Sequence, residues 1–315
     1  MVFFGKPKFS FDEIPPLNGK TVIITGANSG LGRVSALEIA RKGAHVILAC
    51  RSKERALPVV DEIKAVTSNQ NVEFAELDLA SLASVQKFSS EFLGRHLELD
   101  ILINNAGIMA KTEFQLSVDG IEMQLASNHF GHFLLTLNLL PAFPKDRPAR
   151  IVNLSSLAHQ LTRKNGIDFD DYNNPQLYSP WQNYGQSKLA NILFTKELQK
   201  RLEAAGIHNI YVNAVHPGAV DTNLAHGAQY MPPIIVSAFK TLLAVKPEFG
   251  ALTQVYVATS PEIEKENYRG QYFIPTAILA TPSNYATDGE LATKLWDFTV
   301  GLLSEKGFKN QWIVD

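Results

Sequence analysis

The sequence predicts one α/β domain in which a parallel sheet is covered by helices on both faces. Three observations support this prediction. Short apolar runs alternate with amphipathic helical segments along almost the whole chain. These runs are continuously apolar, which is typical of parallel strands buried on both faces. A glycine-rich turn also separates the first apolar run from the first helical segment.

Seven apolar runs are expected to form the strands, at residues 21–24, 44–49, 72–77, 100–103, 150–154, 210–215 and 271–274. The helical segments between them include residues 33–40 and a stretch that ends near residue 63. No internal repeat, low-complexity tract or linker divides the chain. We therefore expect an N-terminal arm over residues 1–17, a single domain over residues 18–300 and a tail over residues 301–315.

The composition is that of a chain with a substantial hydrophobic core. Of the 315 residues, 45% are hydrophobic and 19% are charged, which argues against disorder. A net charge of −2 provides no basic surface of the kind that nucleic-acid-binding proteins carry. The single cysteine, Cys50, excludes an internal disulfide and is compatible with a reducing compartment.

The sequence carries no membrane or export signal that we can recognise. No run approaches the roughly 20 apolar residues of a membrane span. The Phe-rich segment 1–16 is interrupted by lysines, prolines and acids, so it has no signal-peptide core. We expect a cytoplasmic protein whose N-terminal arm packs on the domain. Peripheral contact of this arm with an organelle membrane or a partner is the alternative.

The glycine motif runs from Thr25 to Gly32, with glycines at 26, 30 and 32. It follows a predicted strand and opens a predicted helix. The N-terminus of a helix presents free N–H groups and the positive end of the helix dipole, and glycines let a pyrophosphate approach the backbone. A lone glycine triplet would be weak evidence, but the strand–turn–helix context is the one that a dinucleotide site requires.

A second motif consists of Tyr184 and Lys188, which are four residues apart. On a helix this spacing puts a phenol and an ammonium on one face. The positive charge is expected to lower the pKa of the phenol from its usual value near 10 towards the working range of an acid–base catalyst. A solvated helix face is the alternative. The pair gains weight from the serines Ser155 and Ser156 at the end of the preceding strand.

The chemically suggestive residues gather after the strands. They lie at 25–32, 50–51, 78, 104–107, 155–156 and 216–222. In open parallel sheets, ligands bind beyond the carboxyl ends of the strands. The sequence therefore predicts one site at that edge.

Together these residues resemble the short-chain dehydrogenase/reductase family over roughly residues 18–300. The family pattern Thr-Gly-x-x-x-Gly-x-Gly matches 25–32, its Asn-Asn-Ala-Gly matches 104–107, and its Tyr-x-x-x-Lys matches 184–188. Two local runs, 128–133 and 178–191, are most similar to the branch of retinol dehydrogenases and WW-domain oxidoreductases. The resemblance implies a Rossmann-type, doubly wound sheet of seven strands in the order 3-2-1-4-5-6-7.

The resemblance also implies catalytic roles. Tyr184 would exchange a proton with the substrate oxygen as hydride moves between carbon and nicotinamide. Lys188 would lower the pKa of Tyr184 and bind the nicotinamide ribose. Ser156 would polarise the carbonyl, with Ser155 as its competitor. Asn128 would hold a water that relays protons through the lysine, with a structural asparagine as the alternative.

The choice of cofactor depends on the end of the second strand. An acid there would favour NAD, but the chain has Cys50 followed by Arg51 and then Lys53. A guanidinium without a neighbouring carboxylate favours the 2′-phosphate of NADP(H). Asp78 is expected to contact adenine, with a helix cap as its competing role. The full set of expected cofactor residues is Gly26, Asn28, Ser29, Gly30, Leu31, Gly32, Arg51, Asp78, Leu79, Asn105, Ala106, Gly107, Tyr184, Lys188, Pro217, Gly218, Val220 and Thr222.

The substrate is expected to be a hydrophobic carbonyl or alcohol, such as an aldehyde, a ketone or a retinoid-like compound. Residues 219–247 correspond to the variable lid of the family, and 229–245 are almost entirely apolar. Such a lid suits an apolar ligand, although packing on its own domain or on a second subunit is an equal alternative. Besides Ser156 and Tyr184, we expect Tyr230 and Phe239 to contact substrate. Family habit suggests a homodimer or homotetramer through the long helices that flank the tyrosine.

Other readings remain open. A regulatory or scaffold protein could bind NADP(H) without chemistry, and a double-bond or light-driven reductase could use the same Tyr-Lys pair. His129 and His132 lie three residues apart but lack further ligands, so we expect packing histidines and no metal. His216 is interpreted as a loop residue, with substrate contact as the alternative. The sequon at Asn153 falls in a predicted buried strand, so we expect no glycosylation there.

Overall fold

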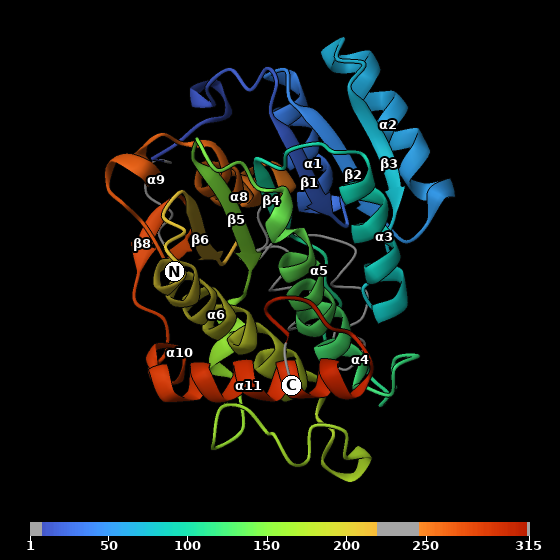
Figure 1. Cartoon of the computed structure of the whole chain (residues 1–315), viewed down its shortest axis with the longest axis vertical. Coiled ribbons are helices and arrows are strands. Elements are labelled where there is room, and N and C mark those ends of the chain that lie inside the picture. The colour runs from blue at the N-terminus through green and yellow to red at the C-terminus, as the bar shows by residue number, and fades with distance from the viewer. Residues whose placement is uncertain (1–7, 219–245, 314–315) are drawn as a thin grey trace.

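A computed structural model describes residues 8–218 and 246–313. The described residues contain an eight-stranded sheet with the strand order β3-β2-β1-β4-β5-β6-β7-β8 (Figure 1). Strands β1 to β7 pair in parallel, and β8 pairs antiparallel with β7. The strands are β1 (Thr21–Thr25), β2 (His45–Cys50), β3 (Val72–Glu76), β4 (Ile101–Asn104), β5 (Ala149–Leu154), β6 (Ile210–Val215), β7 (Tyr272–Ile274) and β8 (Ile278–Ala280).

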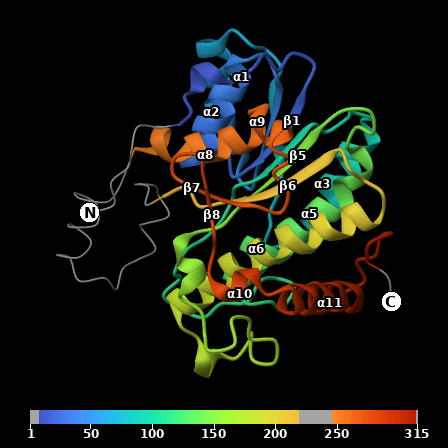
Figure 2. The ribbon, with the colours of Figure 1, turned by 90° about the vertical axis from the view of Figure 1, so that its left-hand side faces the viewer.

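Helices cover both faces of the sheet (Figure 2). One face carries α1 (Gly30–Arg41), α2 (Lys53–Thr67) and α8 (Pro247–Thr259). The other face carries α3 (Leu82–Gly94), α5 (Gly131–Leu139) and α6 (Pro180–Ala204). The other α-helices of the described residues are α4 (Met123–Leu125), α9 (Glu262–Lys265), α10 (Asn284–Thr287) and α11 (Gly289–Glu305).

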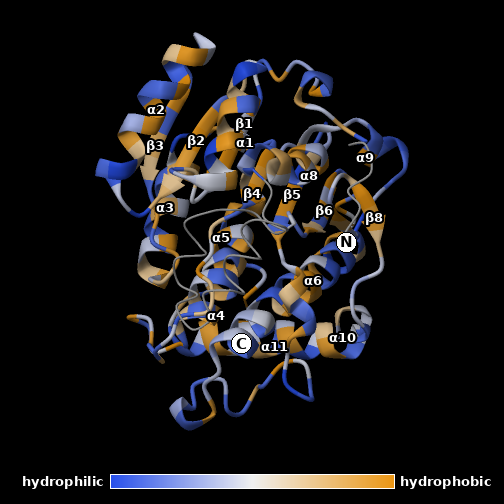
Figure 3. Ribbon diagram, turned by 180° about the vertical axis from the view of Figure 1, so that it is seen from behind, coloured by the Kyte–Doolittle hydropathy of each residue, from blue (hydrophilic) through white to orange (hydrophobic). Residues whose placement is uncertain are grey.

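Each face of the sheet has its own core, because side chains alternate across a strand. On β1, Val22 and Ile24 pack with the α1, α2 and α8 side, whereas Ile23 packs with the α3, α5 and α6 side. Figure 3 shows hydrophobic residues concentrated on the strands and mixed with hydrophilic ones along the surrounding helices. Burial on both faces explains why these strands are continuously apolar in the sequence.

The predicted architecture is confirmed, including the order of the first seven strands. The sequence missed β8, which makes the sheet eight-stranded. This strand has only three residues, and two of them, Ile278 and Leu279, are exposed. It pairs antiparallel with β7, so it lacks the buried apolar run that marks the parallel strands.

The described part of the N-terminal arm packs on the domain. Phe9 is buried and meets the ring of Tyr256 on α8 edge-to-face, with 5.5 Å between ring centroids. Ile14 and Leu17 are also buried. Within the described ranges, none of the helices has both the length and the apolar composition that a membrane span requires.

The C-terminal helix α11 continues past residue 300 and lies along α6 (Figures 1 and 2). Its Trp296 is buried, with its ring centroid 4.9 Å from Phe133 on α5 and 6.2 Å from Phe194 on α6. The guanidinium of Arg201 lies 4.5 Å from the centre of the same indole. Helix α11 therefore packs on α6 and, through Trp296, reaches α5.

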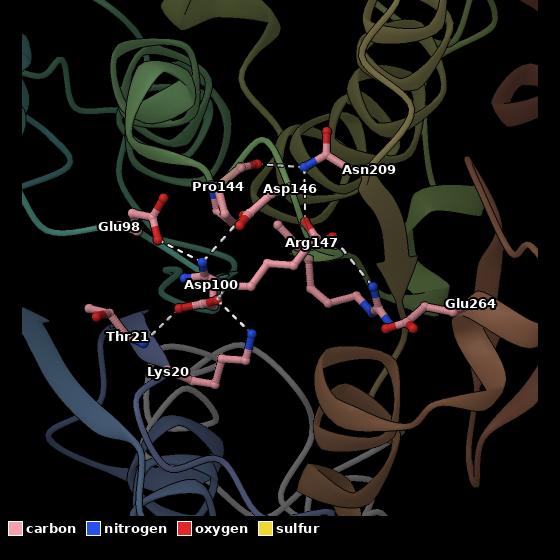
Figure 4. Close-up of polar contacts among 11 residues, drawn as sticks. Lys20, Thr21, Glu98, Asp100, Pro144, Asp146, Arg147, Asn209 and Glu264 are labelled. Atoms are coloured by element: carbon pink, nitrogen blue, oxygen red, sulfur yellow. Dashed lines mark hydrogen bonds and ion pairs between the residues drawn. The ribbon is translucent and has the colours of Figure 1, made fainter.

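A charged network fixes the amino ends of the central strands (Figure 4). Asp100, just before β4, is 2% exposed. Its carboxylate accepts hydrogen bonds from Lys20 Nζ at 2.9 Å, the Thr21 amide at 3.0 Å and Arg147 Nε at 2.8 Å. Because Lys20 and Thr21 belong to the start of β1 and Arg147 precedes β5, the network joins β1, β4 and the approach to β5. It lies at the edge opposite the candidate site.

Candidate active site

The glycine turn between β1 and α1 leaves room for a ligand against the backbone. Gly26 has a positive φ of 66°, which favours glycine. A Cβ on Gly32 would lie 2.6 Å from Asn105 Nδ2 and 2.8 Å from the Gly26 carbonyl oxygen. Ser29 precedes α1 but, among the described contacts, makes no side-chain cap. The first-turn N–H groups of this helix can therefore bind an anion.

Thr25 joins this turn to the end of β4. Its hydroxyl oxygen accepts hydrogen bonds from the amides of Asn105 and Ala106, both at 2.9 Å. The side-chain amide of Asn105 in turn donates to the Thr25 carbonyl at 2.8 Å. The Thr-Gly and Asn-Asn-Ala-Gly motifs, far apart in sequence, thus form one hydrogen-bonded unit.

A cavity of about 360 Å³ opens onto this unit. It lies at the carboxyl edge of the sheet, where the sequence predicted the site. Its lining residues are Gly26, Asn28, Ser29, Gly30, Leu31, Asn105, Ala106, Gly107, Ile108, Met109, Lys111, Leu154, Ser155, Tyr184, Lys188 and Pro217. The cavity therefore brings the glycine motif together with the Tyr-Lys pair.

Cys50 and Arg51 differ in their surroundings at the end of β2. The Cys50 thiol is buried against the backbone of the glycine turn, and burial raises its pKa to about 11. It is therefore a neutral packing group. Arg51 is exposed and forms no ion pair with any part of the chain that the structure describes. By contrast, Arg33 on α1 pairs with Glu62.

Tyr184 and Lys188 are both buried on α6, and Lys188 Nζ lies 5.7 Å from the centre of the Tyr184 ring. The pKa of Tyr184 is raised to about 12, because burial disfavours the phenolate more than the Ser156 hydroxyl stabilises it. The expected lowering by Lys188 is thus absent. Burial also lowers the pKa of Lys188 to about 8, which weakens the ammonium as a source of positive charge.

The two serines after β5 form different hydrogen bonds. Ser155 is buried and its hydroxyl donates to the Lys188 carbonyl at 2.8 Å, which ties β5 to α6. The Ser156 hydroxyl oxygen accepts the Ala158 amide at 3.2 Å and caps the short turn Leu157–Gln160. Because the Ala158 bond uses only the oxygen, the Ser156 hydroxyl can donate its proton to the Tyr184 oxygen or to a substrate oxygen.

Asn128 lies in a π-helical turn, Ala126–Phe130, at the start of α5. Such turns occur frequently at functional sites. Its Oδ1 accepts the Ile108 amide at 2.8 Å, and its Nδ2 donates to the Ile108 carbonyl and to Ser187 Oγ, both at 2.9 Å. The side chain therefore holds the strand-end loop against α6, which is the structural role left open by the sequence.

His132 connects Asn128 to the glycine motif. Its Nδ1 lies 3.0 Å from the Asn128 carbonyl oxygen, and its Nε2 lies 2.8 Å from Thr25 Oγ1. Burial lowers the pKa of His132 to about 3 and that of His129 to about 4, so both rings are neutral. In the described ranges, no group of three or more His, Cys, Asp or Glu side chains could hold a metal ion.

The remaining expected residues fall into two groups. Asp78 accepts the Ala80 amide at 3.0 Å, whereas the cap of α3 is Ser81, so Asp78 is not the helix cap. Leu79 is buried where Gly131 packs closely against its backbone. Pro217 lines the cavity and Gly218 follows it with a φ of 92°. Val220, Thr222, Tyr230 and Phe239, with the lid at 219–245, lie outside the described residues.

The sequence reasoning missed several residues that build the site. Ser187 receives the Asn128 side chain and donates to the Tyr184 carbonyl at 2.7 Å. Thr25 was assigned only as part of a pattern, and His132 only as a packing histidine. Their positions inside or beside motifs were the available signal. The buried Asn153 side chain donates to Thr195 at 2.9 Å, which agrees with the expectation that its sequon is not glycosylated.

Comparison with known proteins identifies the family. The profile described as short chain dehydrogenase matches residues 20–169. The protein named "Short-chain dehydrogenase TIC 32 A, chloroplastic" from Brassica napus is 43% identical over 308 residues, covering 95% of this chain and 94% of the relative. Retinol dehydrogenase 13 from Homo sapiens is 43% identical over 284 residues, covering 88% and 82%. The chain belongs to the short-chain dehydrogenase family.

The resemblance to retinol dehydrogenases seen in the sequence is thereby confirmed. A crystal structure of an uncharacterized protein from Mycobacterium Paratuberculosis is also similar, with a TM-score of 0.76 and 37% identity. The alignment covers 94% of this chain and 97% of that one. As a short-chain dehydrogenase, the chain is an oxidoreductase of a family that binds a nicotinamide cofactor and acts on small carbonyl or alcohol substrates.

Proposed function

We propose that this short-chain dehydrogenase is an NADP(H)-dependent oxidoreductase for hydrophobic aldehydes, ketones or alcohols. One observation supports the proposal most directly: the glycine turn and the Tyr184–Lys188 pair line the same cavity. An anion-binding turn and a buried proton donor are the two components that carbonyl reduction by a nicotinamide requires.

The fit of a dinucleotide rests on the shape of the turn. At Gly32 a Cβ would collide with Asn105, and at Gly26 it would lie 2.9 Å from Ala106 Cβ, so the glycines let the turn pack closely on residues 105–106. Among the described contacts, the first turn of α1 has no side-chain cap, which leaves its N–H groups for a bound phosphate. When bound, the nicotinamide supplies or accepts the hydride. The residues proposed to hold the dinucleotide are the glycine turn, residues 105–107, Asp78, Leu79, Lys188, Pro217, Gly218 and, outside the described residues, Val220 and Thr222.

We assign Arg51 to the 2′-phosphate. Its guanidinium is exposed at the end of β2 and has no carboxylate partner in the described part of the chain. Cys50, at the place of the acid that would favour NAD, is turned into the protein and neutral. A free guanidinium without a competing acid therefore favours NADP(H) over NAD(H).

The protein groups supply the proton chemistry. Because its pKa is raised to about 12, Tyr184 holds its proton at neutral pH and can donate it to a carbonyl oxygen that gains negative charge. Ser156 would donate a hydrogen bond to the same oxygen. We assign Asn128 a positioning role, since its side chain holds Ile108 and Ser187. Reduction is the proposed direction, because a cell that keeps NADPH reduced drives the reaction that way.

The substrate class rests on the surroundings of Ser156 and Tyr184. Leu157 and Leu161, which follow the serine, are about half exposed at 53% and 52%. The Trp181 ring lies edge-to-face with Tyr184, with 6.3 Å between centroids. We propose that these side chains, which lie outside the cavity lining, extend an apolar surface to a carbonyl substrate. The relative named retinol dehydrogenase is compatible with a retinoid-like or lipid-derived compound.

Two alternatives would use the same fold. A regulatory NADP(H)-binding protein would bind the cofactor without turnover, and the chloroplastic relative leaves this open. A double-bond reductase would not depend on Ser156, because no carbonyl oxygen would need that hydrogen bond. A homodimer or homotetramer stays a prediction.

The experiment is a turnover assay with a panel of medium-chain aldehydes, ketones and retinal, with NADPH or NADH. We expect NADPH to be oxidised faster than NADH. Ser156→Ala should lose at least 10²-fold of the turnover, because it removes a direct hydrogen-bond donor to the developing oxyanion. Turnover that survives in Ser156→Ala would favour the double-bond reductase. Tight NADPH binding without turnover on the whole panel would favour the regulatory protein.

A further inference from the structure

We propose that His159 is a positioning residue that orients the Ser156 hydroxyl through a hydrogen bond from its ring to the Ser156 carbonyl. The inference rests on the proposed role of Ser156 in carbonyl reduction. His159 lies in the short turn Leu157–Gln160 and is 1% exposed. It touches neither the cavity lining nor the Tyr184–Lys188 pair in the described contacts, so the motifs do not account for it.

The hydrogen bonds of His159 define the state of its ring. Nδ1 lies 2.7 Å from the Ser156 carbonyl oxygen, and Nε2 accepts the main-chain amide of Ser283 at 3.0 Å. A carbonyl can only accept and an amide N–H can only donate. The ring must therefore carry its proton on Nδ1 and leave Nε2 bare, which is the neutral form. Protonation of Nε2 would place two donors against each other.

These two bonds connect the serine to a distant part of the chain. Ser283 follows β8 and precedes α10, 124 residues after His159. The imidazole also meets Tyr272 of β7 edge-to-face, with 5.4 Å between ring centroids. His159 thus fastens the serine turn to the last strands of the sheet rather than to its own neighbours.

The rest of the serine turn is fastened on other sides. The Ser155 hydroxyl donates to the Lys188 carbonyl, and His216 Nδ1 accepts the Leu157 amide at 3.3 Å. Ser156 itself is tied through its carbonyl to His159 and through its hydroxyl oxygen to Ala158. Among these contacts, the bond from the His159 ring is the one in which another residue's side chain binds a main-chain atom of Ser156. It therefore controls the direction of the serine hydroxyl relative to Tyr184.

The carbonyl of Ser156 also accepts the main-chain amide of His159 at 3.0 Å. A substitution of the imidazole would thus leave the carbonyl bonded once and the turn formed. We expect the protein to fold without the ring and to lose accuracy in the placement of Ser156. This separation of folding from positioning makes the inference testable.

Two matched variants separate the two bonds of the ring. In His159→Asn the side-chain amide lies where Nδ1 was and can still donate to Ser156. In His159→Gln the amide reaches the place of Nε2 and can accept the Ser283 amide, but it no longer donates to the Ser156 carbonyl. We expect His159→Gln to lower kcat by about 10-fold or more, a part of the 10²–10³-fold that loss of a direct oxyanion donor costs. His159→Asn should retain most of the wild-type kcat.

The controls separate positioning from stability. The dissociation constant of NADPH should be the same in both variants, because His159 is outside the glycine turn. An unchanged kcat in a folded His159→Gln protein would overturn the inference, as would equal losses of kcat and melting temperature in both variants. If Ser156→Ala itself retains turnover, the proposed function fails instead, so the two failures are distinguishable.

Nitrogen NMR of histidine-labelled protein provides a readout without turnover. The spectrum of His159 should show a neutral ring with its proton on Nδ1 at neutral pH, a state that the partners on both sides require. A proton on Nε2, or an imidazolium, would contradict the two hydrogen bonds and with them the positioning role.

Discussion

Gly185, next to the proposed proton donor, gives the most detailed prediction. A Cβ on this residue would lie 2.4 Å from the Leu161 carbonyl oxygen and 2.5 Å from that of Ala158. These separations are about 1 Å shorter than the roughly 3.5 Å at which non-bonded atoms pack best. Both obstacles are backbone atoms, so they cannot rotate away. In Gly185→Ala, helix α6 and the serine turn must move apart.

The size of the effect follows from this displacement. Ser156 and Tyr184 are attached to the two elements that separate, and a misplacement of ~1 Å can reduce turnover by ~10²-fold. Overpacking costs roughly 1–3 kcal/mol, partly offset by the better helix propensity of alanine, which contributes up to ~1 kcal/mol. We therefore expect a kcat about 10²-fold lower, a modest loss of stability and NADPH binding close to that of the wild type.

Gly301→Ala is the matched control. Gly301 lies inside α11 and is exposed, and its Cβ would meet no atom within 4 Å. This variant should keep its kcat and gain about 0.5–1 kcal/mol of stability. Turnover and urea unfolding are measured on both proteins. A Gly185→Ala protein with wild-type kcat would refute the close packing of the serine turn on α6.

The remaining predictions concern charge and stability. The pKa of Lys188 falls from 10.5 to about 8 on burial, which corresponds to a stability deficit of roughly 3 kcal/mol. The deficit is complete below pH 8 and vanishes above pH 10.5, so Lys188→Met should abolish turnover yet raise the melting temperature at pH 7; a lower melting temperature would contradict this. The neutral ring of His129 contributes stability above pH 6.5 that is lost as pH falls towards its folded pKa of about 4. His129→Phe should therefore flatten the fall of the urea midpoint in acid, and an unchanged slope would count against it. Arg51→Ala should weaken NADPH far more than NADH in fluorescence titrations, whereas equal weakening would place the 2′-phosphate elsewhere. Asp100→Asn should destabilise the protein by about 1–3 kcal/mol, because Lys20 and Arg147 lose a shared buried partner but are themselves 32% and 31% exposed; a stability within ~0.5 kcal/mol of the wild type would refute this.

The sequence predicted the elements whose signals are local. Seven strands carry apolar runs long enough to be recognised, and the glycine motif has its expected strand and helix on either side. Strand β8 was not predicted, because it has only three residues and its side chains are partly exposed. The order of the strands came from the family resemblance, since periodicity alone does not specify which strands are neighbours.

The site was predictable as a set of residues but not as a set of interactions. Spacing placed Tyr184 beside Lys188 but gave no measure of burial, so the direction of the tyrosine pKa shift was wrong. Thr25 bonds to His132, and His159 bonds to Ser283, each more than 100 residues away along the chain. Such contacts depend on tertiary structure, and no local pattern encodes them. The bonds of Asn128 to Ile108 and Ser187 likewise depend on tertiary structure.

The measurement that tests the central claim most directly is the oxidation of NADPH by the wild type and by Tyr184→Phe, with the best aldehyde or ketone of the panel. We predict turnover in the wild type and a loss of several orders of magnitude in the variant, because the phenylalanine cannot donate a proton. NADPH should bind both proteins with similar affinity. Turnover that persists in Tyr184→Phe would contradict the account.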